Sequence, residues 1–356
     1  MSVDFNTTHE MILAANRNMT QDNWYYVCGA AESETTLRRN RQALDCLALR
    51  PRVLRDVRNI DPSSSFLGHK LRVPVLLAPM GSLHRFTDEG AIAVDNAARD
   101  FEIINFISTV TEPSLEETAA NSPHPKCFQI YVRGDDDWIR DLVRRVVKAG
   151  YPMVTLTVDS AFYGNRERLN PSQIALRRVP ERDFQKGLTW DTVKMIQDEL
   201  GDIPFILKGI MTAEDAELAV EHGVNAVYIS NHGGRQLDHV LGNIDMLPEI
   251  VAAVDGKAEI IIDGGFVRGT DIIKAIALGA RAVGIGRLQA WALGAGGTPG
   301  LIHCLELLEN EIITTMGLLG VTALDELDPS YLTKTSPVNL PHEMSAFPHL
   351  PGGRIV

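Results

Sequence analysis

The chain has 356 residues, of which 45% are hydrophobic and 22% charged, and its formal net charge is -12. This composition is ordinary for a globular protein with a large core. The acidic balance argues against nucleic-acid binding, which needs a basic footprint, and no stretch approaches the apolar length of a membrane span. The N-terminus lacks the basic start and apolar run of a signal peptide, and the four cysteines form no CxxC motif. We therefore expect a cytoplasmic protein with reduced cysteines, no metal site and no membrane partner.

Up to about residue 70 the chain is polar, and its pattern predicts a helical or loop-like lead-in rather than a separate domain. From Val73 onward, short apolar runs alternate with amphipathic stretches that carry helix signals. Among these signals, Ser114-x-x-Glu117 and Thr212-x-x-Asp215 have the spacing of capping boxes. The runs of strand length are Val73–Pro79, Glu102–Ser108, Cys127–Val132, Met153–Asp159, Phe205–Gly209, Ala226–Asn231, Glu259–Gly265 and Ala282–Arg287.

Eight strand–helix units favour a (β/α)8 TIM barrel, in the α/β class, over an open doubly wound sheet. The first run continues into APMGSLHRF and lacks the GxGxxG of a dinucleotide fold. We predict a single domain over residues 1–356, with a lead-in of residues 1–70 and a barrel of about residues 71–330. The remaining residues, about 331–356, are rich in proline and are predicted to form an extended tail that lies on the barrel or on a neighbouring subunit.

One connection is longer than a usual loop between a barrel strand and its helix. It runs from Asn165 to Leu188 after the fourth predicted strand and mixes basic and acidic residues, including Arg177 and Arg178. Two interpretations remain open: a solvated surface loop, or a lid over the mouth of the barrel.

In a TIM barrel the chemistry is carried at the C-terminal ends of the strands. His232, followed by Gly233 and Gly234, would by itself more often be a structural histidine than a base. The glycines allow close approach of a ligand, and Asp159 could orient the imidazole from across the barrel. The polar residues that follow or end the predicted strands are Ser108, Thr109, Gln129, Tyr131, Thr157, Asp159, Lys208, Ser230, Asn231, His232, Asp263 and Arg287.

The last two strand ends combine glycines with an arginine. IDGG contains Asp263 and Gly265, and GIGR contains Gly286 and Arg287. The loops after strands seven and eight are the usual phosphate site of such barrels, although either motif alone could serve only a tight turn. Together with Lys208, the pair predicts a phosphorylated cofactor across the mouth.

Four motifs now support a resemblance that runs from about Trp24 to about Leu327. They are SNHGGRQLD (230–238), LTVD (156–159), KGIMTAEDA (208–216) and IDGGFVRGTD (262–271). The chain resembles the FMN-dependent 2-hydroxy-acid oxidases and dehydrogenases. The resemblance implies an FMN cofactor and oxidation of an (S)-2-hydroxy acid to the 2-oxo acid, with electrons passed to oxygen or another acceptor. It also implies a homo-oligomer, commonly a tetramer.

The same resemblance implies a role for each matching residue. His232 would be the base and Asp159 its partner, with Tyr131 near the reacting hydroxyl. Arg166 and Arg235 would hold the substrate carboxylate with help from Tyr25, although the residues alone do not distinguish Tyr25 from Tyr26. The implied cofactor contacts are Met80, Gly81, Ser108, Gln129, Thr157, Lys208, Ser230, Asp263, Gly265, Arg268, Gly286 and Arg287.

The chain departs from the family pattern at three places. Val267 stands where many members carry the first of two arginines, so only Arg268 remains of that pair. Gly81 stands where many oxidases of the family carry alanine, which favours a poor oxygen user. Val110 replaces a large aromatic residue and, with Tyr163, favours a bulkier substrate side chain such as an aryl group.

Two alternatives remain. One is a different FMN barrel, such as the type 2 isopentenyl diphosphate isomerase class, which explains the phosphate end but not the set His232, Arg235, Arg166 and Tyr131. The other is a non-catalytic flavin-binding paralogue, and Val267 is the only feature that favours it.

Overall fold

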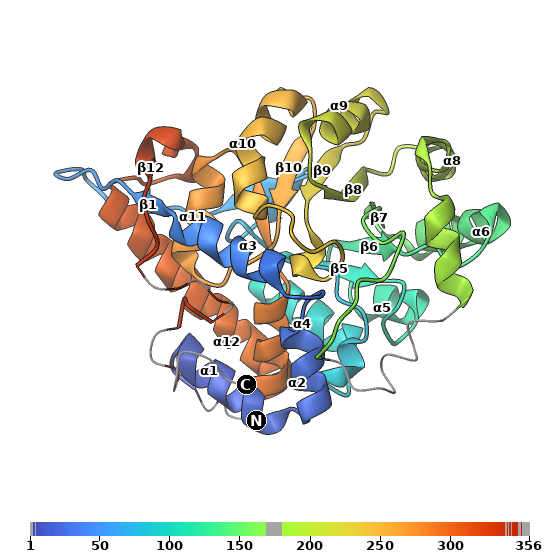
Figure 1. Cartoon of the computed structure of the whole chain (residues 1–356), viewed down its shortest axis with the longest axis horizontal. Coiled ribbons are helices and arrows are strands. Elements are labelled where there is room, and N and C mark those ends of the chain that lie inside the picture. Colours follow the sequence, from blue (N-terminus) through green and yellow to red (C-terminus); the bar gives the residue numbers. More distant parts are fainter. Residues whose placement is uncertain are drawn as a thin grey trace.

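A computed structural model describes residues 3, 5–168, 180–338, 340, 342, 344–347 and 350. Its centre is a closed barrel of eight parallel strands, in which each strand pairs with its neighbour in sequence and the last pairs with the first (Figure 1). The predicted TIM barrel is therefore confirmed, and each predicted run overlaps one strand, with β6 and β8 each extending one residue beyond it. The strands are β4 (Val75–Leu77), β5 (Ile104–Ser108), β6 (Lys126–Ile130), β7 (Met153–Thr157), β8 (Phe205–Ile210), β9 (Ala226–Ile229), β10 (Glu259–Ile262) and β11 (Ala282–Ile285).

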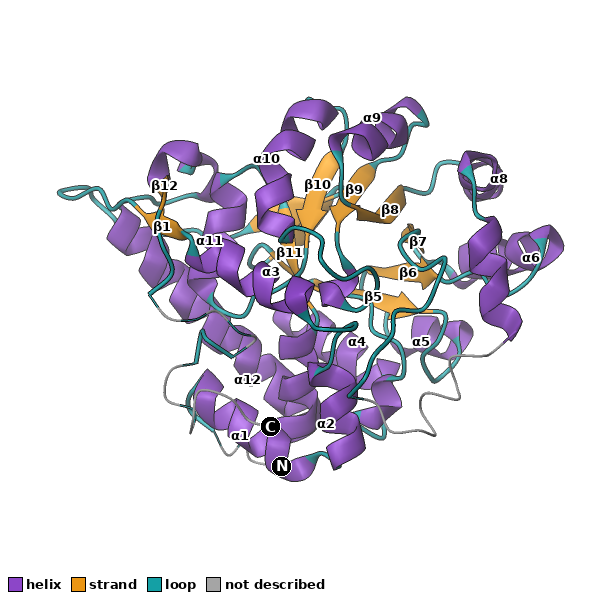
Figure 2. Cartoon of the chain, viewed as in Figure 1, coloured by secondary structure: helices purple, strands orange, loops and turns teal. Residues whose placement is uncertain are grey.

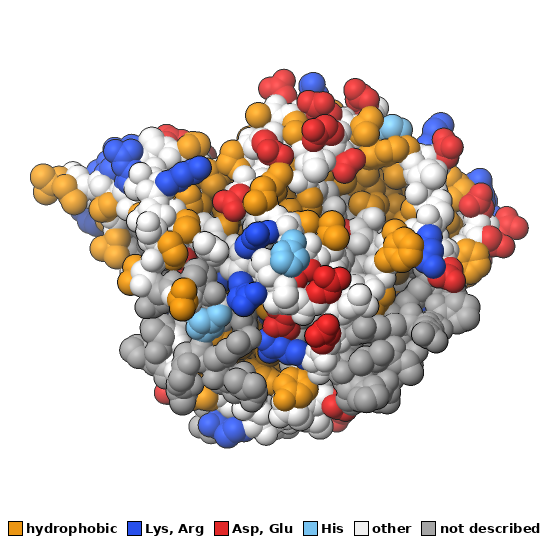
Figure 3. Space-filling model, in the orientation of Figure 1, with side chains coloured by type: hydrophobic (Ala, Val, Ile, Leu, Met, Phe, Trp, Pro, Cys, Tyr) orange, Lys and Arg blue, Asp and Glu red, His pale blue; other side chains and the backbone are white. Residues whose placement is uncertain are grey.

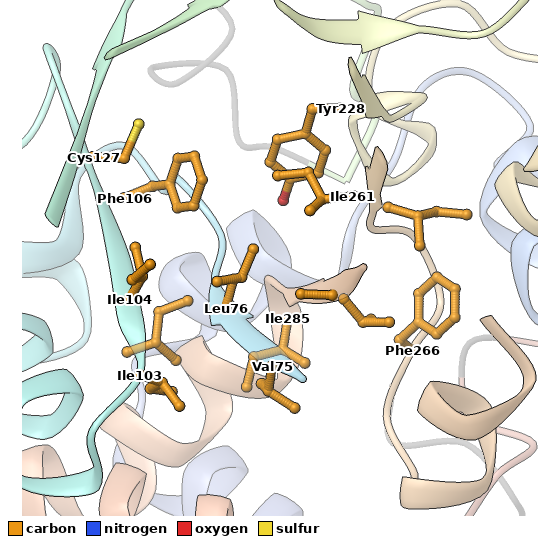
Figure 4. Packing of buried hydrophobic residues seen from close by; sticks show 14 of the residues in the cluster. Val75, Leu76, Ile103, Ile104, Phe106, Cys127, Tyr228, Ile261, Phe266 and Ile285 are labelled. Carbon is orange, nitrogen blue, oxygen red and sulfur yellow. The ribbon is translucent and has the colours of Figure 1, made fainter. Parts of the chain in front are cut away.

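Every second side chain of a strand points into the barrel, and at the base of the barrel these inward-facing side chains are apolar. Phe106 of β5 and Tyr228 of β9 point toward each other, with ring centroids 5.8 Å apart (Figure 4). Gly284 of β11 leaves the space that the Tyr228 hydroxyl fills, because a Cβ there would lie 2.1 Å from that oxygen. The next inward-facing residue toward the C-terminal end of each strand then lies at the floor of the mouth.

Helices surround the barrel on the outside (Figure 2). Their inner faces follow the helical period; in α6, for example, Ile139, Leu142, Val143 and Val146 are buried. The capping box predicted at Ser114 is formed. At Thr212 only one of the two hydrogen bonds of a capping box is present, from the Asp215 amide to Thr212 Oγ1 at 3.2 Å. The surrounding helices are α4 (Ala91–Phe101), α5 (Leu115–Asn121), α6 (Asp136–Ala149), α8 (Trp190–Leu200), α9 (Ala213–Glu221), α10 (Asn243–Val254), α11 (Gly269–Ala277) and α12 (Arg287–Leu319).

The lead-in packs against the barrel helices and contains strands as well as the predicted helices. Helix α1 (Thr8–Asn18) lies along α12, and α2 (Gln21–Cys28) stacks Trp24 on Trp291 of α12 at 6.3 Å. Helix α3 (Thr35–Asp45) docks on the short turn η4 (His232–Gly234) through reciprocal amide hydrogen bonds between Asn40 and Asn231. Strand β1 (Leu47–Leu49) and the hairpin of β2 (Ser64–Phe66) and β3 (His69–Leu71) complete it.

The described part of the tail is held by its own chain. Strand β12 (Leu332–Lys334) pairs antiparallel with β1 of the lead-in, and buried Phe347 packs edge-on against His9 and Trp291. The lid interpretation falls largely on residues 169–179, which lie outside the described residues together with Arg177 and Arg178.

In the face shown in Figure 3, acidic side chains gather over α9 and α10 at the top, and basic side chains are scattered elsewhere. Among the described residues, no helix is long and apolar enough to cross a membrane. The four cysteines carry no disulfide, and Cys28, Cys127 and Cys304 are buried.

Candidate active site

A cavity of about 680 Å³ opens at the C-terminal ends of the barrel strands. Its wall is made by the loops after the strands, by α2 and α3 of the lead-in, and by residues 183–186. The predicted site residues that line it are Met80, Gly81, Tyr131, Arg166, Lys208, His232, Arg235, Asp263, Gly265, Gly286 and Arg287. Asp159, Ser108, Gln129, Thr157 and Ser230 lie directly behind this wall, whereas Tyr25 and Arg268 lie elsewhere.

A row of hydrogen-bonded polar side chains lies directly behind the cavity wall. Ser108 donates to Gln129 Oε1 at 2.6 Å, and Gln129 Nε2 donates to Thr157 Oγ1 at 2.8 Å. Ser108 pairs with Gln129, and Thr157 lies two residues beyond Thr155, the partner of Gln129, so the three side chains face the same side of the sheet. All three are buried, and each bond therefore fixes the orientation of its neighbour.

A second row continues across β8, β9 and the loop after β10. Lys208 Nζ donates to Ser230 Oγ at 2.6 Å and lies 3.2 Å from Asp263 Oδ2, while Ser230 Oγ donates to Asp263 Oδ1 at 2.7 Å. The Lys208 side chain is 4% exposed, so it does not extend to solvent as many lysines at strand ends do. The floor of the cavity thus holds one fixed ammonium group, paired with the Asp263 carboxylate.

His232 is held from both sides of its ring. Nδ1 lies 2.9 Å from Asp159 Oδ1, and Nε2 lies 3.2 Å from the Tyr131 hydroxyl. Its backbone has φ +57°, a left-handed conformation that is uncommon for a non-glycine residue and frequent at functional sites. Gly209 makes room for Asp159 at a β-bulge, since a Cβ there would lie 2.7 Å from the Asp159 Cβ. The glycine in KGI is the only sequence signal for this packing.

The electrostatics of this group favour a neutral imidazole beside a carboxylate. Burial lowers the pKa of His232 below its ordinary value, against the opposing effect of Asp159, and Lys208 and Arg166 lower it further. Burial would raise the pKa of Asp159, but the attraction of His232 and its hydrogen bond bring it below its usual value. Burial also raises the pKa of Tyr131, with Asp159 adding to the effect, so its hydroxyl keeps its proton.

Two guanidinium groups lie beside His232. Arg166 is buried, donates from Nη1 to the Tyr163 hydroxyl and lies 4.0 Å from the centroid of that ring. Arg235 donates from Nη1 to the carbonyl oxygens of Tyr26 and Gly29 at 2.7 and 2.8 Å. Burial and the neighbouring charge of Arg235 lower the pKa of Arg166 to about 10. Two like charges held this close favour binding of an anion between them.

Tyr26, and not Tyr25, lines the cavity. Adjacent residues of α2 differ in direction by about a quarter of a turn, so only one of the two can face the mouth. Tyr26 lies under the Arg235 guanidinium, 5.0 Å from Cζ to the ring centroid, and it contributes to the pKa values of both Arg166 and Tyr131. Tyr25 does not line the cavity, and both tyrosines also pack against the hydrophobic core. The structure therefore places Tyr26 at the cavity wall, and not the expected Tyr25.

The opposite end of the cavity is built from backbone amides. Gly264 and Gly265 have φ values of +96° and +89°, and within the described part of the chain their N–H groups, like that of Gly286, donate to no backbone carbonyl. Gly286 is the N-cap of α12, and a Cβ there would meet only open space. Unpaired amides at a helix N-terminus beside Arg287 are the donor set that suits a phosphate. The residues present therefore fit the phosphate of FMN.

Val267 and Arg268, where the chain departs from the family pattern, point in different directions. Val267 lines the cavity and supplies no charge, whereas Arg268 points away, donating to Thr8 Oγ1 at 2.7 Å and pairing with Glu311. The expectation that Arg268 contacts the cofactor is therefore not met, because as N-cap of α11 it turns toward α1 and α12. Arg41 also lines this end, but both of its Nη atoms bind Asp271, each at 2.7 Å.

Two glutamines that sequence reasoning missed brace the site. Gln236 Nε2 donates to the carbonyl oxygens of Asp159 and Phe162 at 3.2 and 2.9 Å, so it ties the loop after β7 to the loop after β9. Gln185 accepts from the Val132 amide at 2.6 Å and donates to the Thr157 carbonyl at 3.2 Å. Gln236 follows Arg235 within the motif; Gln185 has no local signal.

Known proteins are similar to this chain in sequence and in fold. The FMN-dependent dehydrogenase family matches residues 15–334. An L-lactate oxidase of Nostoc sp. is 41% identical over 338 residues, covering 86% of this chain and 92% of that protein. A glycolate oxidase of Spinacia oleracea is 36% identical over 333 residues, covering 86% of this chain and 90% of that protein. A crystal structure of mandelate oxidase with 3,3-difluoro-2-hydroxy-3-phenylpropionic acid has a TM-score of 0.85 at 36% identity, covering 93% of this chain and 99% of that one. The chain therefore belongs to the family of FMN-dependent 2-hydroxy-acid oxidases and dehydrogenases, and FMN is its cofactor.

Proposed function

We propose that this enzyme oxidises an (S)-2-hydroxy acid to the 2-oxo acid, with His232 as the base. One observation carries the proposal: His232 Nε2 faces the cavity beside the Tyr131 hydroxyl, while Asp159 holds Nδ1 and two arginines lie next to the ring. A neutral imidazole, a neutral phenol and a pair of guanidiniums are the groups that a 2-hydroxy carboxylate needs for binding and deprotonation.

The substrate carboxylate binds between Arg166 and Arg235, with the Tyr26 hydroxyl as a third donor. Arg166 is anchored by Tyr163 and Arg235 by two backbone carbonyls, so neither guanidinium has to be ordered when substrate arrives. A rigid clamp of this kind fixes the carbinol carbon and lowers the entropic part of the barrier. Tyr131 then donates to, or accepts from, the substrate hydroxyl.

His232 Nε2 takes one proton from the carbinol as the C=O bond forms, and the Asp159 carboxylate stabilises the resulting imidazolium through Nδ1. Bound FMN would accept the other hydrogen of the carbinol together with the two electrons. Lys208, held by Ser230 and Asp263, stabilises the negative charge that reduction brings to the floor of the cavity. The amides of Gly264, Gly265 and Gly286 and the side chain of Arg287 would hold the phosphate.

The proposal also covers the acceptor that reoxidises the flavin and the oligomeric state of the enzyme. Gly81 lies against Val110, and a Cβ on Gly81 would come within 2.7 Å of Val110 Cγ2. We expect slow reoxidation by oxygen and faster reoxidation by another acceptor, as the resemblance implies for glycine at this position. We also expect a homo-oligomer, as is common in the family.

The test is to mix the FMN-loaded protein anaerobically with (S)-2-hydroxy acids and to follow bleaching of the flavin absorbance. The expected result is bleaching by at least one (S)-acid and none by its (R)-enantiomer. Air is then admitted, and the recovery time separates an oxidase from a dehydrogenase. Absence of bleaching with every acid would overturn the proposed function.

A further inference from the structure

Arg85 is a further cation of the cavity wall, and the reaction described above does not use it. It ends the short turn η1 (Leu83–Arg85) after strand β4, and its side chain lines the cavity. Asn23 of α2 fixes it: Asn23 Nδ2 donates to the Arg85 carbonyl at 2.7 Å, and Arg85 Nη1 donates to Asn23 Oδ1 at 3.2 Å. The guanidinium also lies 4.9 Å above the centroid of the Tyr26 ring.

Within the described part of the chain, no carboxylate lies within ion-pair distance of Arg85, and its buried Nε has no hydrogen-bond partner. Three other cations that line the same wall are paired with carboxylates. Arg41 binds Asp271, Lys208 binds Asp263 and Lys186 binds Asp183. An arginine keeps its charge at neutral pH, and a partly desolvated guanidinium without a counter-charge is unfavourable unless a ligand supplies one.

Arg85 lies close to the carboxylate clamp without belonging to it. Tyr26 has Arg85 at 4.9 Å and Arg235 at 5.0 Å from its ring centroid, so the two guanidinium carbons are separated by no more than about 10 Å. The carboxyl carbons of a four- or five-carbon dicarboxylic acid lie on the order of 4–5 Å apart. One such molecule can reach both groups, each through charge-assisted hydrogen bonds.

We propose that the substrate is a 2-hydroxy dicarboxylate of four or five carbons, whose second carboxylate binds Arg85. This inference rests on the proposed function and names its substrate class. The carboxylate next to the carbinol binds Arg166 and Arg235, and the oxidation is unchanged: the O–H and C–H bonds of the carbinol break and C=O forms. One proton goes to His232, and the other hydrogen goes to the flavin with the two electrons. An aryl side chain, which Val110 and Tyr163 also admit, would leave Arg85 without a counter-charge.

The experiment compares substrates that differ only in the second carboxylate. Flavin reduction is measured anaerobically with (S)-malate against (S)-2-hydroxybutanoate, with (S)-2-hydroxyglutarate against (S)-2-hydroxypentanoate, and with (S)-mandelate. For the wild type we expect a rate at low substrate concentration at least about 10-fold higher with the dicarboxylate of a pair. Arg85→Met should lower that rate about 10- to 100-fold for the dicarboxylate and change it less than about threefold for the monocarboxylate.

A second measurement does not depend on turnover. Binding of 2-oxoglutarate and of 2-oxopentanoate to the oxidised holoenzyme is followed by the change in flavin absorbance, and Arg85→Met should weaken only the first. Arg85→Lys, which keeps the charge, should recover part of the binding. Arg99→Met serves as the matched control, because Arg99 lies on α4 and pairs with Asp100 at the surface. FMN content and melting temperature show that each variant is folded.

The outcomes separate the two proposals. Flavin reduction by monocarboxylates with no preference for dicarboxylates, or by mandelate above all, overturns the dicarboxylate inference and leaves the proposed function standing. An equal loss on both members of a pair in Arg85→Met also overturns it, because Arg85 would then act only by supporting Tyr26. No reduction by any acid overturns both.

Discussion

The two ends of the active-site cavity differ in the groups that line them: side chains at one end and mainly backbone amides at the other. At one end His232 is held by side-chain hydrogen bonds to Asp159 and Tyr131, which follow other strands, and Arg166 lies beside them, anchored by Tyr163. At the other end the cavity is lined by the backbone amides of Gly264, Gly265 and Gly286, with the guanidinium of Arg287 beside them. The first end depends on the identity of each side chain, whereas the second depends on backbone conformation.

This difference explains how the chain can tolerate Val267. The backbone amides remain whatever side chain follows, so the loss of one arginine removes one ionic contact from a site that keeps several donors. The same tolerance does not extend to the His232 end, where a single change removes either the base or the group that orients it. Substitutions at the two ends should therefore separate cofactor binding from chemistry.

The largest effect is expected from His232→Gln. Loss of a general base typically costs about 10²- to 10⁴-fold in rate, so anaerobic flavin reduction should slow by that order. FMN affinity, measured by quenching of flavin fluorescence, should stay within about twofold of the wild type because the phosphate end is untouched. A His232→Gln variant that reduces its flavin at the wild-type rate would rule out His232 as the base.

The converse change is Arg287→Met. Removing the arginine from the phosphate end should weaken FMN binding about 10- to 100-fold, the usual value of one charge-assisted hydrogen bond. The flavin that remains bound should be reduced at close to the wild-type rate. Val267→Arg is the complementary variant. Because residue 267 lines the same end of the cavity, an added arginine there should tighten FMN binding. Unchanged affinity in both variants would show that the amides alone hold the phosphate.

The pH dependence tests the His232 end more finely. Only neutral His232 can accept a proton, and its pKa is below the ordinary value of 6.5, so kcat/KM should fall on the acid side only below about pH 6.5. The Asp159 carboxylate raises the pKa of His232, so Asp159→Asn should move this acid limb to still lower pH while also slowing the reaction. A limb that moves to higher pH would mean that another group titrates there.

Much of this architecture could be predicted from the sequence, for an identifiable reason. Strands buried on both faces read as apolar runs, and the polar residues that end them, such as Gln129 and Lys208, necessarily meet at one mouth. Barrel periodicity therefore predicts which residues share the floor. It does not predict the hydrogen bonds among them, which depend on register and on the β-bulge at Gly209.

The parts that could not be predicted lie outside that periodicity. Arg268 is one residue from the cavity-lining Val267 but turns toward α1, because the N-cap of α11 directs it there. Gln185 reaches the barrel from the end of a long connection, and no local pattern indicates where such a segment docks. Arg85 lies in a turn after β4 whose conformation depends on its contact with Asn23 of α2.

The smallest effect is expected from Tyr26→Phe, and Tyr25→Phe is its control. Tyr26→Phe removes a hydroxyl from the carboxylate clamp, so KM should rise about 5- to 10-fold with little change in kcat, as expected for one hydrogen bond of about 1 kcal/mol. Tyr25→Phe, on the adjacent face of α2, should leave KM within about twofold. Steady-state kinetics with a reducing (S)-2-hydroxy acid measure both variants, with melting temperatures to show that α2 is intact. If Tyr25→Phe raises KM and Tyr26→Phe does not, α2 presents the other face to the substrate, and the clamp has to be reassigned to Tyr25.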